Sequence, residues 1–354
     1  MDNITVLLTG AGAPGAPSII QSLRLIKERK IKIVGVDMNR DSVGFSMVDK
    51  NYIVPSADSD EFIDSIIKVC DKESVNVIIP LVTKELHKFA KFKDRFLAMG
   101  IKVVVSNEEA LKTANNKYLL MKKAEKIGVP VPKFRLVNTY ELFREAVFEL
   151  GYPKIPVCFK PPISNGLRGF RILRNDVDRL DVLLNQKPTN VITTFEEISP
   201  VLKKTDKFPE LLVMEYLPGE EYSVDSIADE GKPIIAVPRL REKIKMGISF
   251  VGKVVYDKEI IDYSLLLLKG IGLHGNIGFQ FKRDIQGVPK LIESNPRVQG
   301  TMILCTAAGV NMVYFGVKTA LREKFEIPKV EWGTRMIRYW REEFYDPSGS
   351  PFAL

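Results

Sequence analysis

The chain has 354 residues, 45% of them hydrophobic and 27% charged, and its formal net charge is +8. This length allows two or three packed domains, and no apolar run is long enough to cross a bilayer. The basic residues are spread along the chain without interleaved aromatic residues, which argues against a nucleic-acid surface.

The first hundred residues alternate strand and helix patterns, which predicts a parallel sheet wound with helices. Expected strands cover residues 4–10, 32–37, 75–81 and 102–106, and expected helices cover 18–29, 61–73 and 88–100. Residues 106–129 then predict one long helix, with Ser106 as its N-cap and Glu109 three residues later. The prolines of the segment VPVPKF end that helix.

The pattern changes from about Tyr140 onward, where strands follow one another through short turns. A helix over 139–150 precedes expected strands at 155–160, 170–173, 210–217, 221–229, 232–240, 275–284 and 289–294. Turn sequences such as DEGK and DIQGV join several of them as hairpins. This half predicts an α+β fold with antiparallel sheets.

A glycine-rich loop follows the first strand. Gly10, Gly12 and Gly15 form G-x-G-x-x-G, and Asp37 ends the second strand. This pattern fits a dinucleotide site, in which the acid binds a ribose hydroxyl, and so permits a nicotinamide-dependent oxidoreductase. We favour the other interpretation, a tight first turn of a doubly wound sheet, because the second half of the chain explains a different nucleotide.

The segment IPVCFKPPISNGLRG places Lys160 at a strand end, before a loop with Gly166 and Gly169. A fixed ammonium group beside mobile backbone amides can hold polyphosphate oxygens. Lysine at a strand end is common, so Lys160 alone does not distinguish a polyphosphate site from an ordinary strand end.

The next strand ends in Glu215, Tyr216 and Leu217, and Glu221 follows a Pro-Gly turn. Backbone and carboxylate groups along this edge could bind adenine, and Glu221 could accept hydrogen bonds from ribose hydroxyls. The alternative is an ordinary strand–turn–strand with acidic surface residues.

The last two strands of this half form a hairpin that predicts a metal site. Gln280 faces outward from the first strand, and period-two alternation puts Glu293 and Asn295 on one face of the second. Three oxygen-bearing side chains suit Mg²⁺, and Arg297 directly after them could neutralise a transferring phosphoryl group. A solvated hairpin is the alternative.

The remaining chemistry-bearing residues predict little. The cysteines Cys70, Cys158 and Cys305 form no metal or disulfide pattern, which favours a reducing cytoplasm. His87 and His274 have no triad or zinc spacing; we expect His274 to cap a turn. The basic stretch RLREKIKMGIS, residues 239–249, predicts a loop.

The motifs together resemble the ATP-grasp superfamily, and most closely one synthetase module of the carbamoyl phosphate synthase large subunit, from about residue 4 to 320. The segments that carry the resemblance are ANNKYLLMKKAEKIGVPVP, FKPPISNGLRG, MEYLPGEEYSVD, KMGIS and IESNPR. The resemblance implies a Rossmann-like pre-ATP-grasp domain over 1–108, a small lid with its preceding helix over 109–187, and an antiparallel α+β domain with the adenine hinge and metal site over 188–354. ATP is expected between the last two domains.

By motif position, the resemblance implies that Lys117 and Lys160 contact the nucleotide. It assigns Glu215 and Leu217 to the adenine hinge, with Tyr216 between them, and Glu221 to the ribose. It also implies Mg²⁺, with Mn²⁺ as a substitute, on Gln280, Glu293 and Asn295, and a catalytic role for Arg297.

The chain departs from such modules at Gly300, where they have a second arginine that helps hold an oxyanion. It also has one module where the synthase has two. We therefore expect a stand-alone ATP-dependent carboxylate–amine or carboxylate–ammonia ligase that forms an acyl phosphate and acts on small molecules in the cytoplasm. A homodimer is one option for its assembly. The alternatives are a carboxylate kinase or carbamoyl phosphate synthase-like enzyme, the oxidoreductase above, and a nucleotide-binding regulator without turnover.

Overall fold

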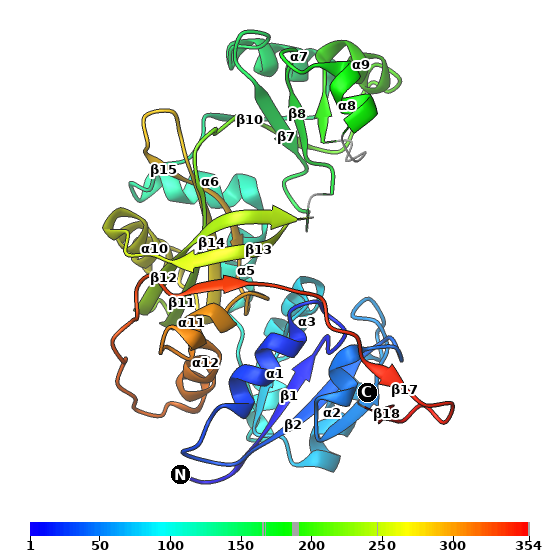
Figure 1. Cartoon of the computed structure of the whole chain (residues 1–354), viewed down its shortest axis with the longest axis vertical. Coiled ribbons are helices and arrows are strands. Elements are labelled where there is room, and N and C mark those ends of the chain that lie inside the picture. The colour runs from blue at the N-terminus through cyan, green and yellow to red at the C-terminus, as the bar shows by residue number, and fades with distance from the viewer. Residues whose placement is uncertain (165, 167, 186–190, 246, 353–354) are drawn as a thin grey trace. The chain divides into compact units, whose positions relative to one another are not determined.

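The computed structural model describes all residues except 165, 167, 186–190, 246 and 353–354 (Figure 1). The chain divides into two compact units. Unit 1 comprises Met1–Asn115, Glu221–Gln280 and Ser294–Leu354, and unit 2 comprises Asn116–Glu220 and Phe281–Glu293. The expected boundaries after residues 108 and 187 stay a prediction.

Unit 1 begins with the expected doubly wound parallel sheet. Its strands lie in the order β3-β2-β1-β4-β5, and all neighbours are parallel. They are β1 (Ile4–Thr9), β2 (Ile31–Asp37), β3 (Lys50–Ile53), β4 (Val77–Ile79) and β5 (Lys102–Val103). Every residue of β1 is buried, because this strand lies in the middle of the sheet. Strand β3 was not predicted, and its residues are mostly exposed.

Helices α1 (Ala16–Arg24) and α2 (Phe62–Glu73) connect these strands as predicted, although α1 ends earlier than expected. The single helix predicted over 88–100 is wrong: α3 (Leu86–Lys91) and α4 (Lys93–Ala98) are separate helices that meet at Phe92. Two short 3₁₀ helices, η1 (Val43–Ser46) and η2 (Thr83–Glu85), complete the connections.

A six-stranded sheet, in the order β15-β14-β11-β12-β13-β16, has most of its strands in unit 1. They are β11 (Glu221–Asp229), β12 (Lys232–Lys245), β13 (Ile248–Val254), β14 (Gly275–Arg283), β15 (Pro289–Asn295) and β16 (Arg335–Ile337). The chain of β14 and of β15 continues into unit 2. The loop predicted over 239–249 is wrong for residues 239–245, which belong to β12, and for Ile248 and Ser249, which begin β13; Met246 lies outside the described residues.

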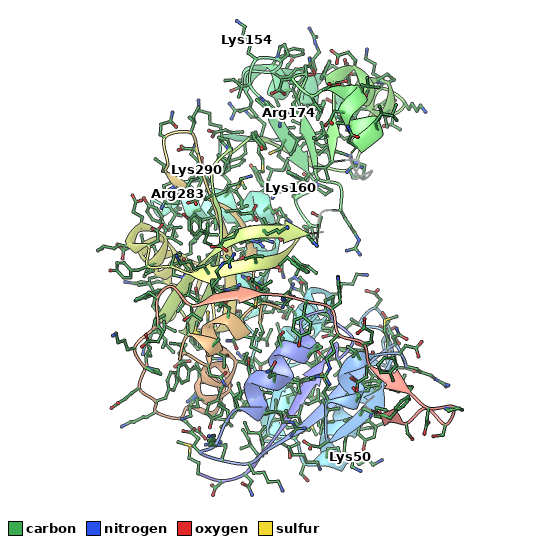
Figure 2. All side chains as sticks on the ribbon, in the orientation of Figure 1. Lys50, Lys154, Lys160, Arg174, Arg283 and Lys290 are labelled. Atoms are coloured by element: carbon green, nitrogen blue, oxygen red, sulfur yellow. The ribbon has the colours of Figure 1, made fainter. Side chains whose placement is uncertain are left out.

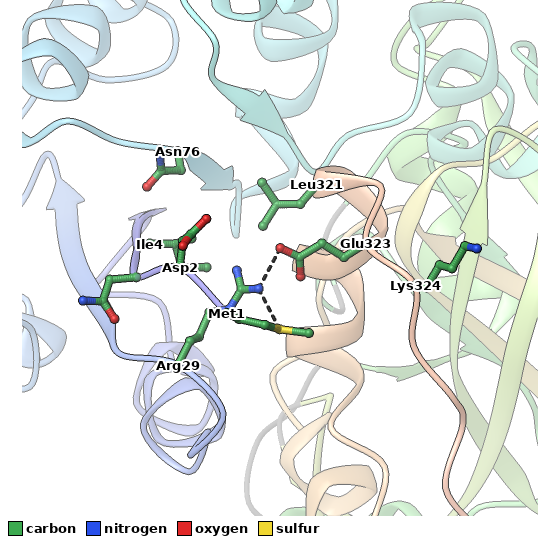
Figure 3. Close-up of a pocket in the computed structure, with 9 residues that line it drawn as sticks. Met1, Asp2, Ile4, Arg29, Asn76, Leu321, Glu323 and Lys324 are labelled. Atoms are coloured by element: carbon green, nitrogen blue, oxygen red, sulfur yellow. Dashed lines mark hydrogen bonds and ion pairs between the residues drawn. The ribbon is translucent and has the colours of Figure 1, made fainter.

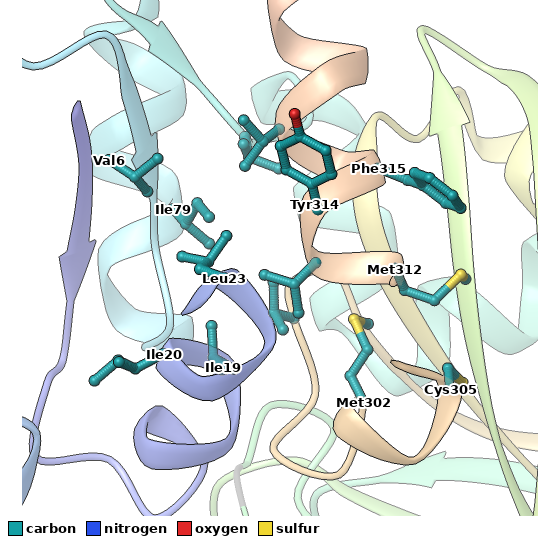
Figure 4. Close-up of a cluster of buried hydrophobic side chains, with 14 of the residues drawn as sticks. Val6, Ile19, Ile20, Leu23, Ile79, Met302, Cys305, Met312, Tyr314 and Phe315 are labelled. Atoms are coloured by element: carbon teal, nitrogen blue, oxygen red, sulfur yellow. The ribbon is translucent and has the colours of Figure 1, made fainter. Parts of the chain in front are cut away.

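The core of unit 1 joins the parallel sheet to the C-terminal helices (Figure 4). Ile20 and Leu23 of α1 pack in one cluster with Met312 and Phe315 of α12 (Met312–Leu321). The same cluster includes residues of β11, β12 and β13, and of α11 (Ile303–Ala307). Helix α10 (Lys258–Ile271) packs on β11 and β12. A shared apolar core explains why sequence-distant segments form one unit.

Unit 2 contains a mixed five-stranded sheet in the order β6-β10-β7-β8-β9. Its strands are β6 (Phe134–Val137), β7 (Val157–Lys160), β8 (Arg171–Leu173), β9 (Ile192–Thr193) and β10 (Leu211–Glu215). Its helices are α6 (Lys117–Lys126), α7 (Tyr140–Glu149), α8 (Arg179–Asn185) and α9 (Phe195–Leu202). Phe143 of α7 packs edge-on against Phe159 of β7, with ring centroids 5.3 Å apart.

The long helix predicted over 106–129 is wrong, because α5 (Glu108–Asn115) and α6 are separate helices. Asn116 has extended backbone, and its side chain accepts hydrogen bonds from the N–H groups of Tyr118 and Leu119 at 3.0 and 3.2 Å. It therefore caps α6 and starts a new helix at Lys117. Ser106 does not cap α5 either: its hydroxyl bonds the backbone of His274, and Asn107 accepts from Ala110 N–H.

Strands β17 (Phe344–Tyr345) and β18 (Pro351–Phe352) form an exposed hairpin near the C-terminus. No helix in the described ranges is long and apolar enough to cross a membrane. A cavity of about 490 Å³ lies beside the start of β1 in unit 1 and is lined by Arg29, Glu323 and neighbouring residues (Figure 3). None of the predicted site residues lines it.

Candidate active site

Lys117, the first residue of α6, is a buried cation in unit 2. Only 4% of it is exposed, and its ammonium donates to Ser164 O at 2.8 Å and lies 3.9 Å from Glu293 Oε2. Burial lowers its pKa to about 8; the charge of Lys160 acts in the same direction, and Glu293 opposes it. The Asn116 cap therefore places an under-compensated positive charge beside a carboxylate.

Lys160 ends β7 as predicted, is 8% exposed, and donates to Ile292 O at 3.2 Å (Figure 2). The loop after it carries Gly166 and Gly169, whose φ angles of 60° and 74° favour glycine. Asn165 and Leu167 of this loop lie outside the described residues. Lys117, Lys160 and Glu293 are thus brought together in unit 2.

The residues predicted to bind adenine lie at the end of β10 and directly after it, and the Glu215 carboxylate is engaged. Lys290 Nζ lies 3.1 and 2.9 Å from its two oxygens, and Lys133 N–H donates to Oε2 at 3.1 Å. Tyr216 is half-buried beneath Lys282, and Leu217 is buried. The backbone N–H of Glu215 donates to Lys133 O at 2.9 Å, so Glu215 is engaged through its backbone as well as its side chain.

Glu221 begins β11 in unit 1, and its Oε1 pairs with Arg241. Arg241 Nε donates to Ser249 Oγ at 2.8 Å and its Nη2 to Gly247 O at 2.6 Å. The carboxylate is therefore held in one orientation by a buried guanidinium. The sequence interpretation missed Arg241, which it assigned to a loop.

The predicted metal-binding strand is β15, which contains both Glu293 and Asn295. Both side chains are half-buried, and Ser294 between them is buried, as alternation predicts. Gln280 is half-buried in β14 between the fully buried Phe279 and Phe281. The described residues contain no cluster of three His, Cys, Asp or Glu that could hold a metal. A metal here would depend on carboxamide oxygens as well as one carboxylate.

Arg297 follows β15 in unit 1 and is held by Thr83 of η2 and by its own loop. Its Nε donates to Thr83 Oγ1 at 3.1 Å, its Nη1 to Val298 O at 2.9 Å, and its Nη2 lies 3.4 Å from Asn295 Oδ1. Contact with Asn295 joins the predicted catalytic arginine to a predicted metal ligand.

The glycine loop is closed by its own contacts. Gly12 N–H donates to Asp37 Oδ2 at 2.8 Å, and Asn39 N–H donates to Oδ1 at 2.9 Å. A Cβ on Gly10 would lie 2.5 Å from Val82 Cγ2, and Gly10 has a φ of 65°. These contacts favour the structural interpretation of the loop, because Asp37 already accepts from the backbone on both oxygens.

His274 caps a turn, as expected. Its Nδ1 accepts from Glu230 N–H at 3.2 Å in the turn between β11 and β12. Burial is the largest cause of a lowered pKa, which is consistent with a neutral ring that accepts this bond.

Comparisons with known proteins agree with this architecture. Residues 207–340 match the family described as "ATP-grasp in the biosynthetic pathway with Ter operon", and residues 6–104 match the PylC-like N-terminal domain. The carbamoyl phosphate synthase large chain of Clostridium acetobutylicum is 26% identical over 307 residues, which cover 83% of this chain and 26% of the relative. The formate-dependent phosphoribosylglycinamide formyltransferase of Edwardsiella ictaluri is 29% identical over 178 residues, covering 49% of this chain and 41% of the relative.

Solved structures show the same fold. An N5-carboxyaminoimidazole ribonucleotide synthetase in complex with ADP superposes with a TM-score of 0.68 at 18% identity, covering 92% of this chain and 79% of that one. Biotin carboxylase from Campylobacter jejuni gives a TM-score of 0.67 at 18% identity, covering 93% and 73%.

The chain spans about a quarter of the length of the carbamoyl phosphate synthase relatives it matches, 26% and 28% in two cases. The three sheets, their strand orders and these matches identify the fold as ATP-grasp. The chain has the ATP-grasp fold, its residues 207–340 match an ATP-grasp family model, and over most of its length it is similar to part of the carbamoyl phosphate synthase large chain.

Proposed function

We propose that the chain is an ATP-dependent carboxylate–amine or carboxylate–ammonia ligase that works through an acyl phosphate. The observation that carries this proposal is the pair of buried lysines, Lys117 and Lys160, beside Glu293 of β15. A buried positive site with one half-buried carboxylate is suited to a polyanion and a divalent cation, and not to an apolar ligand.

The residues fit ATP. Lys117 and Lys160 would hold polyphosphate oxygens, because two buried ammonium groups with a single nearby carboxylate leave positive charge uncompensated. The loop with Gly166 and Gly169 would add backbone N–H donors. The backbone of residues 215–217 would read adenine, and Glu221, oriented by Arg241, would accept from the ribose hydroxyls.

The residues also fit Mg²⁺. Gln280, Glu293 and Asn295 offer hard oxygen ligands, and few protein ligands suffice because Mg²⁺ keeps waters and phosphate oxygens in its shell. When bound, the ion would neutralise phosphate charge. The same oxygen set would accept Mn²⁺.

Two displacements would complete the reaction. An oxygen of the substrate carboxylate attacks the γ-phosphorus, the bond to the bridging oxygen breaks, and ADP leaves with that electron pair. The amine nitrogen then attacks the acyl carbon, loses a proton, and expels phosphate. Arg297 would stabilise the charge on the transferring group, and the protein contributes mainly positioning and electrostatics.

A homodimeric assembly and a cytoplasmic location remain predictions. The carboxylate kinase alternative shares the first displacement only, so dependence on an amine separates the two. A regulator without turnover would bind ATP and release no ADP.

The deciding experiment is a screen of amino acids and small carboxylic acids for ADP release, each with and without ammonia or an amine. We expect phosphate release that needs Mg²⁺, one carboxylate and one amine. Glu293→Gln serves as the inactive control, and Lys122→Gln, an exposed lysine of the same helix α6, as the matched active control. ADP release with a carboxylate but without any amine dependence would favour the kinase, and no release with any acid would contradict both.

A further inference from the structure

The loop after β15 is bound by two guanidinium groups from different parts of unit 1. Arg297 Nη1 donates to Val298 O at 2.9 Å, and Arg338 Nη2 donates to Gly300 O. Arg338 follows β16, and its backbone N–H donates to Phe250 O at 2.8 Å, which extends the pairing of β16 with β13. The sheet therefore fixes the position from which Arg338 reaches this loop.

Arg338 differs from its neighbouring arginines in having no acid beside it. Arg239 pairs with Asp225 at 2.7 Å, Arg335 pairs with Glu242 at 2.7 Å, and Arg241 pairs with Glu221. Across the described ranges, no carboxylate forms an ion pair with Arg338, which is half-buried. Burial and, secondly, the charge of Arg239 lower the pKa of Arg338, so this guanidinium lacks a counter-charge.

Position 300 has no room for the second arginine that synthetase modules have there. A Cβ on Gly300 would lie 3.0 Å from Gly15 Cα, and a Cβ on Gly15 would lie 2.4 Å from Gly300 Cα. The last glycine of the N-terminal loop thus packs backbone to backbone against the loop after β15. A side chain at either position would force the two segments apart.

The same loop contains a second group, the Gln299 carboxamide, with an unpaired hydrogen-bond donor. Gln299 is 7% exposed; its Oε1 accepts from Arg239 Nη2 at 3.2 Å, but its buried Nε2 has no hydrogen-bond partner. Uncompensated donors are costly in a protein interior, and such groups are commonly retained where a ligand completes them. The Arg338 guanidinium and the Gln299 carboxamide therefore both bring N–H donors to this loop, and the Nε2 of Gln299 has no partner.

We propose that Arg338, with Arg297, binds the carboxylate substrate or its acyl phosphate, at a site bordered by the glycine loop at Gly15. This inference deepens the proposed ligase function and rests on it for the identity of the anion. A guanidinium offers five N–H donors, and the one bond to Gly300 O leaves others to engage an oxyanion. The N-terminal glycine loop would then take part in substrate recognition and not in nicotinamide binding.

The test uses inorganic phosphate as the probe, titrated calorimetrically into the full chain with saturating Mg-ADP so that the polyphosphate site is filled. We expect Arg338→Gln to weaken phosphate binding by roughly 10–100-fold, as loss of a charge-assisted hydrogen bond does. Arg338→Lys should lie between, since it keeps the charge without the planar fork. Arg335→Gln, three residues earlier and paired with Glu242, is the matched control and should bind as wild type does.

Equal phosphate affinity in wild type and Arg338→Gln would overturn the inference, as would undetectable binding in wild type. If Arg338→Gln does not fold, shown by a lost melting transition, the comparison of Arg338→Lys with wild type decides by the same criterion. The two proposals fail separately. Absence of ADP release with every acid would contradict the ligase while leaving the phosphate comparison intact, and unchanged phosphate binding in an active ligase would contradict only the role of Arg338.

Discussion

Nucleotide affinity should fall as the pH rises above about 8, because the binding site depends on the protonation of Lys117. Burial is the largest cause of its lowered pKa, about 8 against the ordinary 10.5, and the neighbouring charge of Lys160 adds to it. A bound polyphosphate would place negative charge beside the ammonium and raise that pKa again. Binding therefore takes up a proton wherever the free protein has lost it.

The size of the effect follows from the pKa of the free protein. If the neutral amine contributes no binding, affinity is constant below about pH 8 and falls tenfold per pH unit above it. Between pH 7 and pH 9.5 the dissociation constant for ADP should rise about 30-fold, or about 2 kcal/mol. The stability of the fold depends on pH in the opposite sense. The pKa of Lys117 is lower in the folded than in the unfolded protein, so burial of the charged ammonium destabilises the fold at neutral pH. This destabilisation is relieved as the pH rises from about 8 toward 10.5.

The assay is a calorimetric titration of ADP at pH 7 and pH 9.5, with Lys117→Arg as the control. The guanidinium stays protonated across this range, so the variant should keep nearly the same affinity at both values. A wild-type ratio below about threefold, or an equal decline in wild type and Lys117→Arg, would refute the assignment of the pH dependence to this residue.

Three further outcomes test the remaining site residues. Glu293→Gln should abolish Mg²⁺-dependent ADP formation without lowering the melting temperature, because the Glu293 side chain is only half-buried and lies beside the Lys117 ammonium. Near-normal turnover of this variant would exclude Glu293 as a metal ligand. Arg297→Lys should lower turnover roughly 10²–10³-fold with ADP affinity unchanged, as loss of a preorganised donor does; a lowered melting temperature with normal turnover would assign Arg297 a structural role. NAD and NADP should show no micromolar binding by calorimetry, because Asp37 already accepts from Gly12 and Asn39.

Local patterns predicted the fold well where they reflect burial. The run ITVLLTG is a central strand with every residue of β1 buried, and the alternation of residues 289–295 places Glu293 and Asn295 on one face of β15. Strand β3 could not be found this way, since KNYI has no apolar run and is mostly exposed. The continuous helical pattern of 106–129 concealed the break at Asn116, because a capping asparagine is also tolerated inside a helix.

The sequence did not indicate which charged side chains of distant segments form ion pairs. Lys290 and Glu215 are 75 residues apart, and nothing in either motif indicates that their side chains meet. The same holds for the backbone contact between Gly15 and Gly300. Gly300 stands out in the sequence only as an absent arginine, and the reason for a glycine there becomes visible only once the packing is known.

The pairing of Glu221 with Arg241 depends on a strand irregularity that the sequence did not indicate. Counting from the turn at Glu230 and Gly231 would place Ser223 opposite Pro238, but the register of β11 and β12 shifts between Ile227 and Ala228, so Ser223 lies opposite Arg239. Two-residue steps along each strand then put Glu221 and Asp225 on one face with Arg239 and Arg241. In this register Glu221 falls directly opposite Arg241, whereas Asp225, which is opposite Val237, is a diagonal neighbour of Arg239. Arg241 also donates to Ser249 Oγ and Gly247 O at the turn into β13, so this part of the basic stretch predicted as a loop links that turn to Glu221, the acid expected at the ribose. A shift of the 247–249 turn would therefore reach the Glu221 carboxylate through one buried guanidinium.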